Sequence, residues 1–192
     1  MNKSLPSQLP KLRKLDRFME HHNGYIAGGC FKNLFLDQPI KDIDIFFIDE
    51  IDYNEAVEYY EGDAEYVKVV DHDRFTTFKC NVTGLYIQLI KSFTGEPEDV
   101  VGNFDFTITK AYYCKDELGE YEFYCHERFF EHLVNRKLVL DDQILFPAST
   151  FNRSYRYTKY GFGLCGESKQ KLVHALQGVE LPTQQDFYFG ID

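Results

Sequence analysis

The sequence predicts an α+β fold, in which helices flank a mixed β-sheet within one compact domain of residues 1–192. Three observations support this class. Apolar residues recur with helical spacing near both ends of the chain, whereas the middle alternates apolar and polar residues as half-buried strands do. Hydrophobic residues make up 44% of the chain and aromatic residues 17%, which suits a packed interior rich in strands. No repeat, low-complexity tract or linker divides the chain.

The first elements follow from apolar spacing and from the placement of glycine. Leucine and methionine recur along one side of residues 7–22, which predicts an amphipathic helix. Residues 25–27 are a short apolar strand that ends at a glycine pair, and the apolar segment 30–36 is expected to be a helix. Alternation then predicts a strand over 42–48, and a helix follows over 52–61.

The middle of the chain is expected to be a run of strands separated by turn residues, and the end is expected to be helical. Strands are predicted at 64–71, 75–81, 84–91, 104–114 and 120–125, with a short acidic helix at 96–101. Helices are predicted at 127–136, 149–161 and 167–177. The sheet would then occupy about residues 24–125, and a helical part about residues 126–177.

The segment from Gly28 to Asp44 carries the strongest chemical signal. Gly28 and Gly29 precede a helix, where backbone N–H groups and the helix dipole favour a phosphate. Asp42 and Asp44 alternate along a strand, so their carboxylates are expected on the same face. Adjacent carboxylates repel each other unless a cation neutralises them, and oxygen ligands of this kind suit Mg²⁺ bound with substrate phosphates. The alternative is a glycine turn beside a solvated acidic strand end.

This segment resembles the head of the nucleotidyltransferase superfamily that includes DNA polymerase β, and most closely the branch of CCA-adding enzymes and bacterial poly(A) polymerases. That branch typically reads Gly-Gly-x-Val-Arg-Asp-Leu-Leu-Leu-Gly and then Asp-x-Asp-Leu, and the spacing here fits without gaps. Lys32 replaces the usual arginine and Asn33 the usual aspartate, so a bidentate fork and a carboxylate are lost. The resemblance implies a nucleotidyltransferase-like fold, Mg²⁺ or Mn²⁺ as cofactor and a nucleoside triphosphate as substrate.

Two-metal catalysis in this superfamily needs a third acid on a later, neighbouring strand, and Asp105 is the best candidate. From Phe104 to Ile108, apolar residues alternate with polar ones, which places Asp105 on the polar face of a predicted strand. The order of strand, short helix and Phe-Asp-Phe-Thr resembles compact nucleotidyltransferase-like proteins of phages and prophages. The metal ligands and catalytic residues implied by the resemblance are therefore Asp42, Asp44 and Asp105.

A basic helix near the C-terminus is the second candidate region. Arg153 and Arg156 share one face of the predicted helix, and Lys159 lies close to it. The run resembles the Arg-Ala-x-Arg-Phe…Gly-Phe helix of the CCA-adding branch, in which the arginines help to hold the incoming nucleotide. The resemblance implies that these three residues bind the nucleotide together with the glycine pair and Lys32. An exposed basic helix without a ligand is the alternative.

Composition limits the partners and the compartment. The net charge of −10, from 31 acidic and 21 basic residues, argues against a tight grip on duplex DNA or on whole tRNA through phosphate contacts. Five cysteines without metal-like spacing predict reduced thiols and a cytoplasmic protein, in a phage-infected or bacterial cell. The apolar runs are shorter than the ~20 residues of a membrane span, and the N-terminus is too polar for a signal region.

The predicted function is the metal-dependent transfer of a nucleoside monophosphate to a hydroxyl acceptor by two-metal in-line attack. The sequence leaves the acceptor open among a tRNA 3′ end, another RNA, a protein hydroxyl and a small molecule. A toxin-like or phage-encoded transferase is one version of this hypothesis. The alternative is a non-catalytic binding or regulatory module that keeps the fold, which the changes at Lys32 and Asn33 favour and the three carboxylates oppose.

Overall fold

The computed structural model describes residues 1–3, 9–141, 144–177 and 179, and a mixed sheet of eight strands forms its centre. In chain order the strands are β1 (Asn2–Lys3), β2 (Tyr25–Ala27), β3 (Asp42–Phe47), β4 (Tyr66–His72), β5 (Phe75–Cys80), β6 (Tyr86–Thr94), β7 (Ala111–Lys115) and β8 (Tyr121–Cys125). Their order across the sheet is β1-β8-β7-β2-β3-β6-β5-β4. β3 and β6 are parallel and the other neighbours antiparallel, so the predicted mixed sheet is confirmed.

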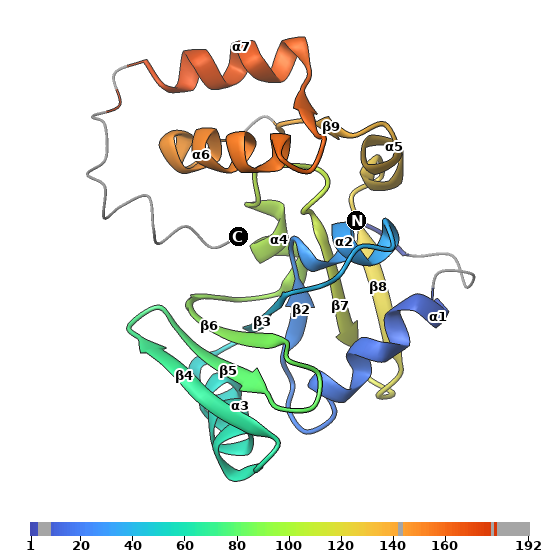
Figure 1. Ribbon diagram of the computed structural model, residues 1–192, viewed down its shortest axis with the longest axis vertical. Coiled ribbons are helices and arrows are strands. Elements are labelled where there is room, and N and C mark those ends of the chain that lie inside the picture. Colours follow the sequence, from blue (N-terminus) through green and yellow to red (C-terminus); the bar gives the residue numbers. More distant parts are fainter. Residues whose placement is uncertain (4–8, 142–143, 178, 180–192) are drawn as a thin grey trace.

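Helices cover the sheet and extend beyond one of its ends, where α6 and α7 lie together (Figure 1). The helices are α1 (Leu9–Leu12), the 3₁₀-helix η2 (Arg13–Phe18), α2 (Cys30–Phe35), α3 (Glu50–Gly62), α4 (Pro97–Gly102), α5 (Phe129–Val134), α6 (Pro147–Thr158) and α7 (Gly166–Ala175). A small parallel sheet joins β9 (Lys137–Leu138) to β10 (Gly163–Leu164). None of the described helices combines the length and the apolar composition needed to cross a bilayer.

The two faces of the sheet carry apolar clusters of different size. The larger cluster joins Ile26 and Ile43 of the sheet to Phe31 of α2 and Tyr60 of α3. The smaller cluster contains Ala27, which follows Ile26 along β2, and it packs against α4. Successive strand residues point to opposite faces, so the smaller cluster occupies the opposite face of the sheet. This face is the one on which the candidate site lies.

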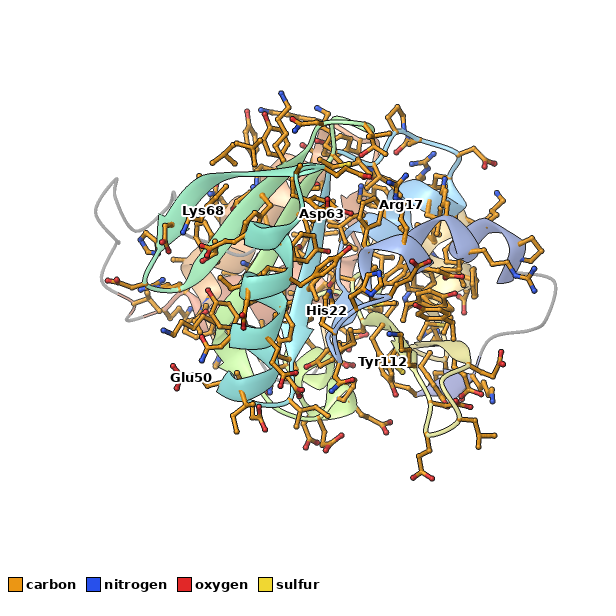
Figure 2. All side chains as sticks on the ribbon, turned by 90° about the horizontal axis from the view of Figure 1, so that it is seen from below. Arg17, His22, Glu50, Asp63, Lys68 and Tyr112 are labelled. Carbon is orange, nitrogen blue, oxygen red and sulfur yellow. The ribbon has the colours of Figure 1, made fainter. Side chains whose placement is uncertain are left out.

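Several helix boundaries differ from the sequence expectation, among them those of the first helix and of α3. The helix predicted over 7–22 is split into α1 and η2 and ends at Phe18, and its first two predicted residues lie outside the described part of the chain. α3 starts before the predicted residue because the Asp49 side chain accepts hydrogen bonds from the N–H groups of Ile51 and Asp52, at 2.8 and 3.0 Å. Figure 2 shows α3 running along the sheet, with β4 at the outer edge.

The strand predicted over 104–114 begins only at Ala111. Before it, Phe106 forms an isolated bridge with Leu140, and both the N–H and the hydroxyl of Thr109 bond back to the Phe106 carbonyl at 2.9 and 2.8 Å. The polar and the apolar residues of this turn are all buried. The alternation in the sequence therefore did not mark a strand with one exposed face, because both sides of the segment are packed.

Candidate functional site

The aspartate pair lies at the start of β3, between β2 and β6. Asp42 is opposite Tyr86 of β6 in the ladder, and Asp44 is opposite both Gln88 of β6 and Ala27 of β2. Residues i and i+2 of a strand share a face, so both carboxylates lie on the α4 side of the sheet. Asp42 is exposed, whereas Asp44 is 8% exposed. The site is thus half open, with one accessible and one buried carboxylate.

The first turn of α2 lies within the electrostatic reach of these carboxylates. Burial and then the charges of Asp44 and Asp42 raise the pKa of the Cys30 thiol, which therefore stays protonated. Burial lowers the pKa of the Lys32 ammonium group, and the negative charge of Asp42 opposes that shift. The start of helix α2 therefore lies close to the aspartates of β3.

Lys32 is directed into the junction between α2 and α6. Its side chain is buried, its ammonium group donates to the side-chain oxygen of Asn33, and it lies 4.6 Å from the ring centre of Tyr160 and 5.5 Å from that of Tyr157. Asn33 Nδ2 in turn donates to the Pro39 carbonyl at 2.8 Å. The cation predicted to contact a phosphate is therefore also a contact between two helices.

The glycine pair is divided between the sheet and the helix. Gly28 has φ of +92°, a backbone conformation that favours glycine, and its N–H donates to the Ala111 carbonyl at 3.1 Å. Gly29 is the N-cap residue of α2 and has helical dihedral angles. The Gly28 N–H is thus bonded within the sheet, and the predicted phosphate contact would depend on Gly29 and the first turn of α2.

Asp105 contacts α6. Its Oδ2 accepts hydrogen bonds from Arg153 Nε at 2.8 Å and Nη2 at 2.7 Å, and its Oδ1 accepts from the N–H of Phe106 at 2.9 Å. Arg153 Nη1 also donates to Ser149 Oγ at 3.2 Å. The two side chains of the ion pair are 9% and 16% exposed. Asp105 therefore has a charged partner of its own from the basic helix.

Across the described part of the chain, no group of three or more His, Cys, Asp or Glu side chains is arranged to hold a metal ion. The donor set that fits Mg²⁺ is the pair Asp42 and Asp44, since Mg²⁺ is commonly bound by one or two carboxylates together with phosphates. The position beside Asp44 on β6 holds Gln88, whose Nε2 donates to Thr77 Oγ1 at 3.4 Å. Sequence reasoning missed Gln88 because nothing local to it indicates that β6 pairs with β3.

The other basic residues of α6 are placed as follows. Arg156 is half-buried in the last turn of the helix, and Lys159 is its C-cap residue, with Nζ 5.7 Å from the ring centre of Tyr155. Arg136 donates through Nη1 to the Tyr160 carbonyl at 3.3 Å. The C-terminal end of α6 is thus surrounded by cations and tyrosines, and Lys32 joins it to the aspartate site.

The fold is similar to that of CCA-adding enzymes and tRNA nucleotidyltransferases. A CCA-adding enzyme with CTP is similar at a TM-score of 0.60, with 18% identity over 91% of this chain and 44% of that one. The Thermotoga maritima CCA-adding enzyme complexed with tRNA gives 0.59, with 18% identity over 91% and 43%. A tRNA nucleotidyltransferase with primer tRNA and an incoming ATP analogue gives 0.58, with 15% identity over 85% and 49%.

The chain belongs to the Gabija anti-defense 2 family, whose model matches residues 1–136. Gabija anti-defense 2 of Bacillus phage SPbetaL7 is 29% identical over 171 residues, which cover 88% of this chain and 41% of that protein. The chain thus spans less than half the length of this relative and of the three structures. The resemblance to the superfamily and to its phage type, stated from the sequence, is confirmed.

Proposed function

We propose that this chain binds a nucleoside triphosphate at Asp42 and Asp44 and transfers its nucleoside monophosphate to a hydroxyl acceptor, as part of a phage countermeasure against Gabija defence. The observation that carries the proposal is the shared face of the two carboxylates, beside the start of α2, in a nucleotidyltransferase fold. We place this activity in the cytoplasm of the host bacterium. The acceptors that fit are an RNA 3′ end, such as that of tRNA, and a protein hydroxyl.

The residues divide the work of binding and orientation. Asp42 and Asp44 would hold the divalent ion, Mg²⁺ or Mn²⁺, which would supply positive charge to the triphosphate and to the reacting oxygens. Gly29 and the first turn of α2 would bind the phosphates through N–H groups, and the buried Lys32 would add positive charge nearby. On α6, Arg153, Arg156 and Lys159 complete the nucleotide site and hold the base or the phosphates in place.

The assignment of Asp105 as a third metal ligand requires a rearrangement. Its carboxylate is bound by Arg153, so Asp105 could join a second metal ion only after that arginine turned to another anion. The triphosphate is such an anion, because arginine binds phosphate in the same bidentate manner as carboxylate. We therefore propose that Asp105 becomes a metal ligand only when a nucleotide is bound.

A second candidate is a nucleotide-binding module without transferase activity. It is favoured by the ion pair between Asp105 and Arg153 and by the amide of Gln88 at the position beside Asp44. With two carboxylates, the site suits one ion and its phosphates, and binding alone needs no more.

The test uses the purified chain with each nucleoside triphosphate labelled at the α-phosphate, Mg²⁺ or Mn²⁺, total RNA and a bacterial protein extract. We expect label in RNA or in protein and pyrophosphate in solution, both lost in Asp44→Asn. Binding of the triphosphate should weaken about tenfold or more without divalent metal, a loss of ~1.4 kcal/mol. Metal-dependent binding without transfer would establish the second candidate, and equal binding with and without metal would refute both.

A further inference from the structure

Tyr86 is a hydroxyl group that the fold places beside the aspartate pair. It is the first residue of β6 and lies directly opposite Asp42 of the parallel strand β3, with its N–H bonded to the Lys41 carbonyl at 3.0 Å. Neighbouring strands are ~4.8 Å apart, and residues in register point to the same face. Tyr86 and Asp42 are therefore adjacent side chains on the open face.

The phenol ring of Tyr86 is accessible and lies beside a cation. The residue is 44% exposed, whereas the other described tyrosines of the sheet are buried or half-buried. Lys79 is its register partner on β5, and the ammonium group of Lys79 lies 6.0 Å from the ring centre. A tyrosine side chain is longer than that of an aspartate, so the Tyr86 oxygen can reach further from the sheet than the Asp42 carboxylate. A phosphate bound through a metal ion on the carboxylates would lie at that height above the sheet.

We propose that Tyr86 is an acceptor within the chain itself, so that the protein attaches a nucleoside monophosphate to its own phenol oxygen. This inference rests on the proposed function. The Tyr86 oxygen forms a bond to the α-phosphorus, the bond from that phosphorus to the oxygen bridging it to the β-phosphate breaks, and pyrophosphate leaves. The phenolic proton passes to water, to which the ring is open. The product is a tyrosyl nucleoside monophosphate ester, and no oxidant or reductant is needed.

Proximity and charge both favour this internal acceptor. A group fixed beside the reacting phosphate does not lose the translational freedom that an external acceptor must lose. The chain carries a net charge of −10, which disfavours the capture of a long RNA as acceptor. Lys79 would stabilise the negative charge of the new phosphodiester. The ester would occupy the space next to Asp42, so each chain would accept at most one monophosphate and then bind a second nucleotide poorly.

The experiment incubates the whole chain with each nucleoside triphosphate labelled at the α-phosphate and with Mg²⁺ or Mn²⁺, without RNA. We expect label that stays with the denatured protein, at no more than one per chain, and peptide mass spectrometry that locates it on Tyr86. Tyr86→Phe should reduce the label at least tenfold. The matched control is Tyr59→Phe, which removes a hydroxyl from α3 on the other face of the sheet. Urea unfolding is used to check that both variants are folded.

A second measurement does not depend on transfer. Tetranitromethane nitrates accessible tyrosines, and we expect a nucleotide with Mg²⁺ to slow the nitration of Tyr86 severalfold in the wild-type chain but not in Asp44→Asn. Pyrophosphate release with label only on another residue or on added RNA would overturn the inference and leave the proposed function intact. Nitration of Tyr86 at the same rate with and without the nucleotide would also count against the inference. The absence of both pyrophosphate and label with every acceptor would overturn the proposed function as well.

Discussion

Removal of Arg153 should reveal whether Asp105 is chiefly a structural anion. Both side chains are largely buried, at 9% and 16% exposure, and Nε and Nη2 of Arg153 lie 2.8 and 2.7 Å from Asp105 Oδ2. Removing one partner of a buried ion pair costs about 3–5 kcal/mol, because the other charge is left without compensation. Their partial exposure places the pair at the lower end, so we expect Arg153→Met to lower the free energy of unfolding by about 3 kcal/mol.

The double-mutant cycle of Arg153→Met and Asp105→Asn measures the coupling. The double variant removes both charges of this pair, so its destabilisation should be smaller than the sum of the two single effects by about 2 kcal/mol. Unfolding in urea, followed by circular dichroism, provides the four free energies. The control is the pair Arg128 and Glu131, whose side chains are 52% and 47% exposed and which should show much weaker coupling. Additive effects at Asp105 and Arg153 would refute the reasoning.

Three further outcomes are expected. Gln88→Glu places a third carboxylate beside Asp44 and should tighten Mn²⁺ binding in calorimetry about tenfold or more; weaker binding would show that the two side chains do not converge. Gly24→Ala should cost about 1–3 kcal/mol in urea unfolding, because its Cβ would lie 2.6 Å from Ile45 Cγ2. Burial lowers the pKa of His22 to about 4. Between pH 6.5 and 4 the unfolded chain binds this proton and the folded chain does not, so roughly 3 kcal/mol should be lost as pH falls through this window and be absent in His22→Gln.

The sequence predicted the geometry of the aspartate pair because the information for it was local. The glycine pair, the short helix α2 and the aspartate strand are consecutive along the chain, so spacing alone placed Asp42 and Asp44 on one face. It could not identify Gln88, because that residue gains its position from the pairing of β3 with β6, and strand pairing is not encoded in the periodicity of either strand. Asp105 was assigned to a strand by alternation, whereas its segment is a turn packed on both sides.

The changes at Lys32 and Asn33 can be explained together. Asn33 accepts the hydrogen bond from Lys32 through Oδ1 and donates to the Pro39 carbonyl through Nδ2. An ionised aspartate has no N–H to donate, so it could not make the second contact. A compact ammonium group also fits against the rings of Tyr157 and Tyr160 without the planar fork of an arginine.

Lys32 and Asn33, which depart from the CCA-adding pattern, therefore connect α2 with α6 and with the loop that leads to Asp42. Random loss of function would not be expected to replace two residues with a pair, Lys32 and Asn33, that bond to each other. The features that bear on catalysis are instead the amide of Gln88 and the ion pair of Asp105 with Arg153. These determine how many negatively charged ligands are available to bind a metal ion. Both can be altered by single substitutions that leave the Lys32 junction intact, so the two candidate functions can be separated in one set of variants.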